Sequence, residues 1–347
     1  MTSSCSSEPN GVDKWMRILT GSVAALSMFG CTVIIISYAL WPRLRSKSRS
    51  LLVCLSVGDY MNALGVFVSS VWPPEGNDVG CKVQAVMTTC GSLLSFFWTS
   101  CLAIYIFIVI VLNNRELAKR LLVVFHVVSW GLPAVVTCVA LVKGKLGYTE
   151  SSDTVGWCWI EAREVADSEA VVWMVVTGKG WEIISYVVVV VLYIATKLYI
   201  CQEKKAPKVF ITKSTFETAQ TINRKLTFVP IVFVISRMWG TLRFFFIILQ
   251  KHCLAKSPIF LALHGIGDSA QGFANFIIFC VFTPKVHNHW INTICITFCC
   301  KWKEPRDPSE HDHLLPVKSN ILAFFSGFRS RPPQQQNNRK IMSSSSC

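Results

Sequence analysis

Four polar residues recur at helical spacing in the last long apolar stretch of this sequence: His264, Asp268, Gln271 and Asn275. At about 100° per residue, their spacing of four, three and four places them on one stripe of a helix. These residue types can pair with charges and can donate or accept hydrogen bonds. In an otherwise apolar helix such a stripe must face other protein groups, so it predicts a buried ligand pocket or switch network.

Further charges lie inside apolar stretches: Asp59, Lys179, Glu182, Arg237 and Arg243. With Asp268 they make three positive and three negative charges, so they can neutralise one another. Lys179 and Glu182 are three residues apart, which predicts an ion pair on one helix face. Arg237 and Arg243 are six residues apart and cannot share a face. We therefore expect Arg237 to point inward and Arg243 to reach the outer membrane interface.

The expected depth of each residue divides the candidates into two groups. The expected ligand-pocket residues are Trp98, Lys179, Glu182, Trp239, Arg243, His264, Asp268 and Gln271. The expected switch network consists of Asp59, Tyr105, Arg237 and Asn275, with Asp59 and Asn275 in contact. The alternative for each single residue is a packed polar group that its neighbours satisfy.

The same residues argue against an enzyme. A zinc hydrolase needs several converging His and Asp ligands, but the last apolar stretch offers only His264 and Asp268, and His126 lies far from them in depth. Residues 258–283 contain no Lys for a retinal Schiff base. We find no Ser-His-Asp arrangement and no phosphate-binding loop. No cofactor or metal is expected.

The elements that carry these residues are seven long apolar stretches, which predict an all-α bundle of seven transmembrane helices. Each stretch meets the length of roughly 20 residues that crosses a bilayer. Of the 347 residues, 52% are hydrophobic and 16% are charged, and the mean hydropathy is +0.45, which excludes an ordinary soluble domain. The predicted spans are Ile18–Leu40, Leu51–Val71, Val83–Leu112, Leu121–Val142, Ala170–Ile200, Leu226–Leu249 and Pro258–Phe282.

The net charge of +14 concentrates in alternate loops rather than in a nucleic-acid-binding patch. The loops after the first, third and fifth spans are basic, whereas the opposite loops carry mostly acids. This positive-inside asymmetry predicts an outside N-terminus, a cytoplasmic tail and a multi-pass protein of the plasma membrane. The basic residues expected to contact a cytoplasmic partner are Arg115, Lys119, Arg120, Lys213 and Arg224.

Four of the 15 cysteines are expected on the oxidising side: Cys81 at the start of the third span, Cys158 in the long outer loop, and Cys5 and Cys253, for which a second pairing stays open. We expect a disulfide between Cys81 and Cys158 that holds this loop over the mouth of the bundle. The remaining boundaries follow: a short extracellular segment at 1–17, the bundle at 18–283, and a cytoplasmic tail at 301–347 that is polar and expected to be disordered.

Residues 284–300 place Val286, Trp290, Ile294 and Phe298 at near-helical spacing. This pattern predicts a short amphipathic helix on the inner membrane surface, and a disordered juxtamembrane segment is the alternative. Three nearby cysteines are candidates for lipidation: Cys295, Cys299 and Cys300.

Several motifs resemble secretin-like G-protein-coupled receptors. Trp98 with Tyr105 resembles their third span, Cys158-Trp159 resembles their outer-loop Cys-Trp, and Gln271-Gly272 resembles the end of their seventh span. Ser129-Trp130-Gly131-Leu132-Pro133 is similar to their Gly-Trp-Gly-x-Pro. The slime-mould cyclic-AMP receptors share much of this pattern. Longer blocks from Phe96 to Gly267, in matching order, are similar to an orphan member of the G-protein-coupled receptors.

The sequence also departs from these families. Residues 1–17 hold one Cys and cannot form the Cys-rich hormone-binding ectodomain of secretin-like receptors, and Leu102-Ala103 replaces their Glu-Gly. The resemblance implies a receptor that relays an unknown extracellular ligand to a heterotrimeric G protein. It favours Gq with a phosphatidylinositol–calcium second messenger, and it allows a ciliary membrane.

Two alternatives stay open at the level of the sequence. A seven-span transporter or channel could use the buried charges as an ion or proton relay, although no internal repeat supports a duplicated transporter. An adaptor could use the seven spans only to display its tail.

Overall fold

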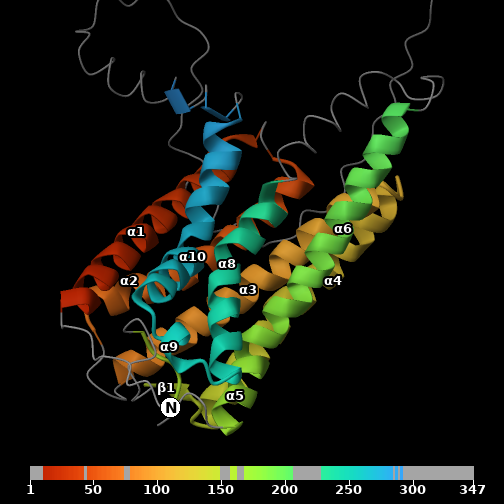
Figure 1. Cartoon of the computed structure of the whole chain (residues 1–347). Helices are drawn as coiled ribbons and strands as arrows, with labels where there is room; N and C mark the ends of the chain where they lie inside the picture. The colour runs from red at the N-terminus through yellow and green to blue at the C-terminus, as the bar shows by residue number, and fades with distance from the viewer. Residues whose placement is uncertain are drawn as a thin grey trace, which may run out of the picture. The chain divides into compact units, whose positions relative to one another are not determined.

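The computed structural model describes residues 11–42, 45–73, 79–148, 157–161, 168–205, 228–283, 286–287 and 290–291. The chain divides into two units, 1–298 and 299–347, and every described residue belongs to the first. The principal helices are α1 (Gly11–Leu40), α2 (Lys47–Val71), α3 (Val79–Ile110), α4 (Arg115–Val142), α5 (Ser168–Met174), α6 (Gly180–Lys205), α8 (Phe228–Ile248), α9 (His252–Ala255) and α10 (Pro258–Phe276). They form an antiparallel bundle (Figure 1).

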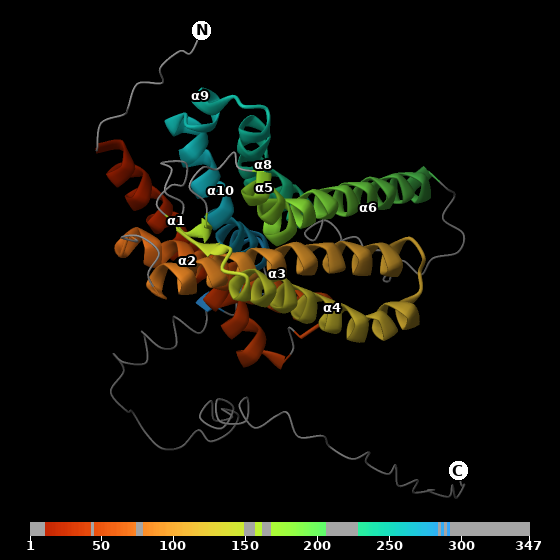
Figure 2. The same cartoon turned by 90° about the horizontal axis from the view of Figure 1, so that it is seen from below.

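Helix α3 lies at the centre of this bundle, against α2, α4 and α6 (Figure 2). Helix α1 packs against α2 and α10, and α10 packs against α8. Glycines permit close approach between helices, because a Cβ atom on Gly91 of α3 would lie 2.5 Å from the backbone nitrogen of Asn62 in α2. A Cβ atom on Gly58 of α2 would lie 2.8 Å from the Cβ atom of Leu94.

Six continuous helical segments of the described chain are long and apolar enough to cross a membrane. They correspond to the first six predicted spans. The predicted seventh span is present as α10 followed by the π-helical segment η3 (Ile277–Val281). It does not meet the same measure of apolarity, because its stripe of His264, Asp268, Gln271 and Asn275 lowers its hydropathy. The stripe faces the neighbouring helices rather than lipid.

The fifth span is not the uniform helix that its sequence predicts. Helix α5 passes into a π-helical turn, η2 (Val175–Lys179), before α6 begins at Gly180. Helices α3 and α4 also begin earlier than predicted, at Val79 and Arg115, because their polar first turns contribute little to an apolar pattern. Hydropathy locates the apolar part of a helix and misses such ends.

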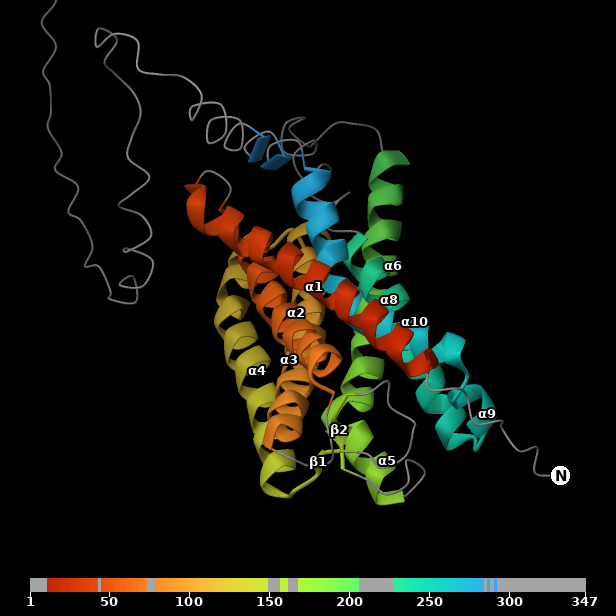
Figure 3. The same cartoon turned by 90° about the vertical axis from the view of Figure 1, so that its left-hand side faces the viewer.

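The predicted disulfide between Cys81 and Cys158 is present, with Cα atoms 5.5 Å apart. Beside it, β1 (Leu146–Gly147) pairs antiparallel with β2 (Trp159–Ile160). The side chain of Gln84 accepts a hydrogen bond of 2.7 Å from the backbone nitrogen of Cys158. We call this part of the bundle, where β1, β2 and α5 lie together (Figure 3), the disulfide end.

The opposite end, where α1, α3 and α6 finish, is called the basic end. After η3, the described residues Val286 and Trp290 pack against the bundle: Trp290 Nε1 donates 2.8 Å to Ser37 Oγ, and its ring contacts Trp41. The amphipathic helix expected over 284–300 is thus described only in part. Residues 1–10, the tail at 301–347 and the lipidation candidates Cys295, Cys299 and Cys300 lie outside the described residues.

Candidate functional site

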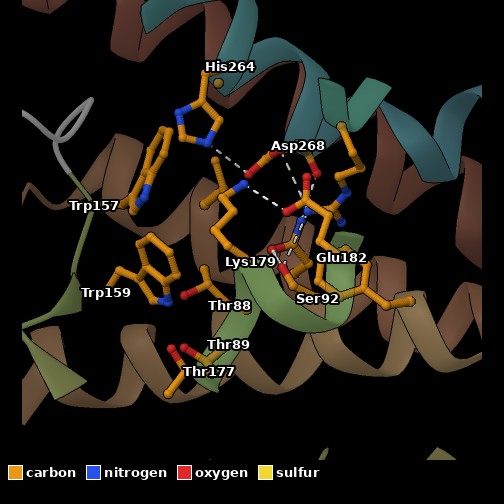
Figure 4. Close-up of a pocket in the computed structure, with 16 residues that line it drawn as sticks. Thr88, Thr89, Ser92, Trp157, Trp159, Thr177, Lys179, Glu182, His264 and Asp268 are labelled. Carbon is orange, nitrogen blue, oxygen red and sulfur yellow. Dashed lines mark hydrogen bonds and ion pairs between the residues drawn. The ribbon is translucent and has the colours of Figure 1, made fainter. Parts of the chain in front are cut away.

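A pocket opens between the helices toward the disulfide end and encloses about 580 Å³, including its open mouth. Its walls come from α2, α3, η2, α6, α8 and α10, and the segment before β2 covers one side (Figure 4). It is lined by Asn62, Val66, Thr88, Thr89, Ser92, Phe96, Trp157, Trp159, Thr177, Gly178, Lys179, Glu182, Arg237, His264, Gly265 and Asp268.

Lys179 and Glu182 form the predicted ion pair, with Lys179 Nζ 2.7 Å from Glu182 Oε2. Both side chains are buried, Glu182 to 2% exposure. The other carboxylate oxygen, Oε1, accepts hydrogen bonds from Tyr186 and Thr241. The π-helical turn η2 ends at Lys179 and places Thr177, Gly178 and Lys179 on the pocket wall. Single π turns inside helices often occur at functional sites.

Asp268 is the centre of a second charged group. Its Oδ2 lies 3.2 Å from His264 Nε2, and its Oδ1 lies 3.7 Å from Arg237 NH1. Arg237 is 1% exposed, its guanidinium lies over the Phe96 ring, and its Nε donates to Gln271 Oε1 at 3.4 Å. The stripe on α10 therefore faces the interior, as its spacing predicts.

Arg243 is buried, and the expectation that it reaches the outer interface is wrong. Its Nε donates 2.8 Å to the carbonyl oxygen of Ala255, and its NH1 lies 3.2 Å from His264 Nδ1. The short helix α9 follows α8 and supplies this carbonyl oxygen. Arg243 therefore finds a hydrogen-bond acceptor inside the bundle, although it does not share a helix face with Arg237. The sequence pattern of α8 alone could not reveal that acceptor.

Asn62 links α2 to the pocket and was not among the predicted residues. Its Nδ2 donates 2.8 Å to the backbone oxygen of Asp268, and its Oδ1 accepts 3.0 Å from Ser92. Ser92 in turn lies 3.4 Å from Arg237 NH1. The sequence did contain an indication of this role: Asn62 follows Asp59 by three residues and therefore lies on the same face of the helix.

Asp59 and Asn275 make the expected contact closer to the basic end. Asn275 Nδ2 donates 3.1 Å to Asp59 Oδ2, and Ser95 Oγ donates 2.7 Å to Asp59 Oδ1. All three side chains are buried. Together with the Asn62 bond, this gives two direct hydrogen-bond links between α2 and α10.

The structure places some candidates away from the pocket wall. Trp98 is fully buried between α3 and α4, where its ring contacts those of His126 and Trp130. Trp239, Arg243 and Gln271 also do not line the pocket. Tyr105 is half-buried near the basic end and packs on a separate apolar cluster.

Several pocket residues could not be inferred from the sequence. Trp157 lies just before β2 and Trp159 begins it, and the disulfide at Cys158 fixes the path of this segment. Thr88, Thr89 and Ser92 lie on α3, where hydroxyl residues are ordinary helix components and give no pattern. In the described part of the chain no group of three or more His, Cys, Asp or Glu side chains could hold a metal ion.

At the basic end, Arg115, Lys119 and Arg120 occupy the first turns of α4, and all three are exposed. Lys119 pairs with Glu116 at 2.7 Å. The other two basic candidates, Lys213 and Arg224, lie outside the described residues. The three exposed basic residues of α4 give this end of the bundle a positively charged surface.

Comparison with known proteins gives a consistent relationship. The family described as Slime mold cyclic AMP receptor matches residues 13–301. The chain is 32% identical to G-protein coupled receptor 157 of Mus musculus over 86% of its length and 91% of that protein. It is 35% identical to G-protein coupled receptor 157 of Homo sapiens over 76% of its length and 79% of that protein.

A more distant relative extends the match beyond animals. Cyclic AMP receptor 1 of Dictyostelium discoideum is 28% identical over 39% of the chain and 33% of that receptor. The family match covers most of the chain, from the first turn of α1 to beyond the last described residue. The chain therefore belongs to the slime mold cyclic AMP receptor family and is a multi-pass G-protein-coupled receptor, not an enzyme.

Proposed function

We propose that this receptor relays an extracellular stimulus to a heterotrimeric G protein of the Gq class, with calcium as the second messenger. The observation that carries the proposal is the course of α10. This one helix bears Asp268 in the pocket and Asn275 in the pair with Asp59. The two residues are seven positions apart, roughly 10 Å along the helix, and share a face.

The two contacts between α2 and α10 connect the pocket with the deeper pair. Asn62 holds the backbone at Asp268, and Asp59 holds the side chain of Asn275. A ligand that displaces α10 at Asp268 changes the first contact and strains the second. A receptor needs such a bistable connection, in which a ligand favours one of two arrangements.

In the proposed orientation, the disulfide end faces outward and the basic end faces the cytosol. The distribution of Lys and Arg between the loops supports this orientation. The exposed residues Arg115, Lys119 and Arg120 then face the G protein. Lys213 and Arg224 are further contact residues in this proposal, on the basis of the sequence. We place the receptor in the plasma membrane, including its ciliary part, with Cys295, Cys299 and Cys300 as acylation sites.

Guanine-nucleotide exchange tests the proposal directly. The full-length receptor in lipid nanodiscs is incubated with purified Gq, Gi or Gs heterotrimers, and calcium and cyclic AMP are measured in parallel in cells. We expect exchange on Gq and a calcium response. Replacing Arg115, Lys119 and Arg120 together by Ala should reduce exchange several-fold without changing surface expression.

The outcomes separate the parts of the proposal. Exchange on Gi or Gs alone would contradict the Gq assignment and leave the relay intact. Ion flux through receptor-containing proteoliposomes, with no exchange on any heterotrimer, would instead support a transporter. Asn275→Ala should change the basal exchange rate if the Asp59 pair takes part in the switch.

A further inference from the structure

The charged side chains that line the pocket are balanced. Lys179 and Arg237 contribute two positive charges, and Glu182 and Asp268 contribute two negative charges. Each cation also has a carboxylate nearby, at 2.7 Å for Lys179–Glu182 and 3.7 Å for Arg237–Asp268. The pocket therefore holds no spare charge of either sign from these four groups.

His264 does not change this balance, because its partners select the neutral ring. The Arg243 guanidinium has only donors, so His264 Nδ1, which lies 3.2 Å from Arg243 NH1, must accept. The ring hydrogen is then on Nε2, which donates to Asp268 Oδ2 at 3.2 Å. A doubly protonated ring would point a hydrogen at Arg243.

Two of the charged groups have atoms that the described residues leave without a hydrogen-bond partner. They are Asp268 Oδ1 and Arg237 NH2, and both are buried. Asp268 and Arg237 both line the pocket, and the 3.7 Å between Asp268 Oδ1 and Arg237 NH1 is longer than a hydrogen bond. Buried polar atoms normally find partners, so the pair lacks one donor for Asp268 and one acceptor for Arg237.

The other side of the pocket is aromatic. Trp157 and Trp159 come from the loop that the disulfide holds, and both lie on the same side of the pocket in Figure 4. Trp157 contacts the His264 ring edge to face, at 5.4 Å between centroids. Indole rings beside a charged group suit a ligand with a flat apolar part next to a polar end.

We propose that this pocket binds a small zwitterion of the aromatic amino-acid type. Its ammonium group donates to Asp268, its carboxylate accepts from Arg237, and its flat side chain packs against Trp157 and Trp159. A ligand with zero net charge preserves the balance of the pocket, whereas an anion or a cation adds an uncompensated charge in a low-dielectric site. This assignment rests on the proposed function, because it names the chemistry of that receptor's stimulus.

Three probes of similar size separate charge from shape. L-Phenylalanine, 2-phenylethylamine and 3-phenylpropionate share a phenylalkyl body and are a zwitterion, a cation and an anion at neutral pH. Each is added at millimolar concentration to the purified full-length receptor, and the thermal midpoint reports binding. We expect L-phenylalanine to bind at least about tenfold more tightly than either other probe.

Two variants test the mechanism by reversing the preference. Asp268→Asn leaves the pocket with one surplus positive charge, so 3-phenylpropionate should become the best probe. Arg237→Gln leaves one surplus negative charge, so 2-phenylethylamine should become the best. Glu116→Gln and Lys143→Gln are matched controls, since they make the same changes of charge at exposed positions and should keep the preference for L-phenylalanine.

Tighter binding of either singly charged probe to the wild-type receptor overturns the proposal, as does binding of none of the three. If a variant does not fold, the comparison of the three probes on the wild-type receptor still decides the question. Binding is measured without a G protein. If the probes fail to bind as expected but nucleotide exchange is normal, only the proposed class of ligand is contradicted. Normal selectivity without exchange on any heterotrimer contradicts the proposed function instead.

Discussion

The buried carboxylate of Glu182 is bound by three neighbouring side chains. Glu182 accepts hydrogen bonds from the side chains of Lys179, Tyr186 and Thr241. An isolated charge at the middle of a membrane costs about 2.5–3.5 kcal/mol on insertion scales, and pairing offsets that cost. Removing one partner should therefore be worse than removing both.

A double-mutant cycle on the Lys179–Glu182 pair tests this expectation. Glu182→Gln keeps an acceptor for Tyr186 and Thr241 but leaves the Lys179 charge unpaired, so it should destabilise the receptor by about 3–5 kcal/mol. Lys179→Met in the same chain should recover a substantial part of that loss. Thermal unfolding in detergent measures the effect, and strictly additive changes would show that the two side chains do not interact.

The sequence predicted the charged pairs better than it predicted the pocket. Spacing on one helix was sufficient for Lys179 with Glu182, and relative depth was sufficient for Asp59 with Asn275. The position of Arg243 depends on a carbonyl from α9, and that of Trp157 depends on the course of a loop. Such contacts are set by tertiary structure, which periodicity along a single helix does not contain.

At the scale of the helices, α2 and α3 pack so closely that their contact has no space for a side chain at Gly91. A Cβ atom at Gly91 would meet the backbone of α2 2.5 Å away, whereas a Cβ atom at Gly131 of α4 would meet nothing within 4 Å. Both residues lie inside helices. The same substitution at the two sites therefore has opposite expected effects.

Gly91→Ala should destabilise the bundle by about 1–3 kcal/mol, because backbone must move to admit the methyl group. Gly131→Ala should be neutral or stabilising by up to about 1 kcal/mol, because alanine is the better helix former. The thermal midpoints of the two purified variants provide the comparison. Equal effects would mean that α2 and α3 are not packed so closely.

The disulfide joins the start of α3, at Cys81, to the pocket wall, because Cys158 lies between Trp157 and Trp159 in the sequence. Replacing Cys81 and Cys158 by Ser should lower stability by about 2–4 kcal/mol and weaken probe binding, because both Trp side chains lose their anchor. Cys138→Ser removes an exposed free thiol and serves as the control. If the double variant binds L-phenylalanine as the wild type does, the bridge does not position the pocket.

Apolar length was enough to locate the helices but not their irregular parts. The first six spans have segments of membrane-crossing length and apolarity, and the seventh is present as α10 and η3. The π turn at Val175–Lys179 cannot be recognised from hydropathy. A π turn differs from an α-helical turn in its hydrogen-bond pattern, whereas hydropathy reports only which residues are apolar. Only the three-dimensional structure shows that this turn places Lys179 on the pocket wall.

At the scale of the whole molecule, an odd number of spans separates the two ends of the chain. An epitope tag at the amino terminus should bind antibody on intact cells, and a tag at the carboxyl terminus should bind only after permeabilisation. The loop charges supply the physical reason. Staining of both tags on intact cells would contradict the proposed orientation and the assignment of the basic end to the G protein.

The polar stripe of α10 has a consequence for how the receptor is made. This segment is less apolar than the six other spans of the described bundle, so it is the one least able to leave the translocon for lipid by itself. Its hydrogen-bond partners on α2 and α8 precede it in the chain and are therefore synthesised earlier. We therefore expect integration of the last span during biosynthesis to depend on the preceding helices, and variants such as Asn62→Leu to leave newly made chains with that span outside the bilayer.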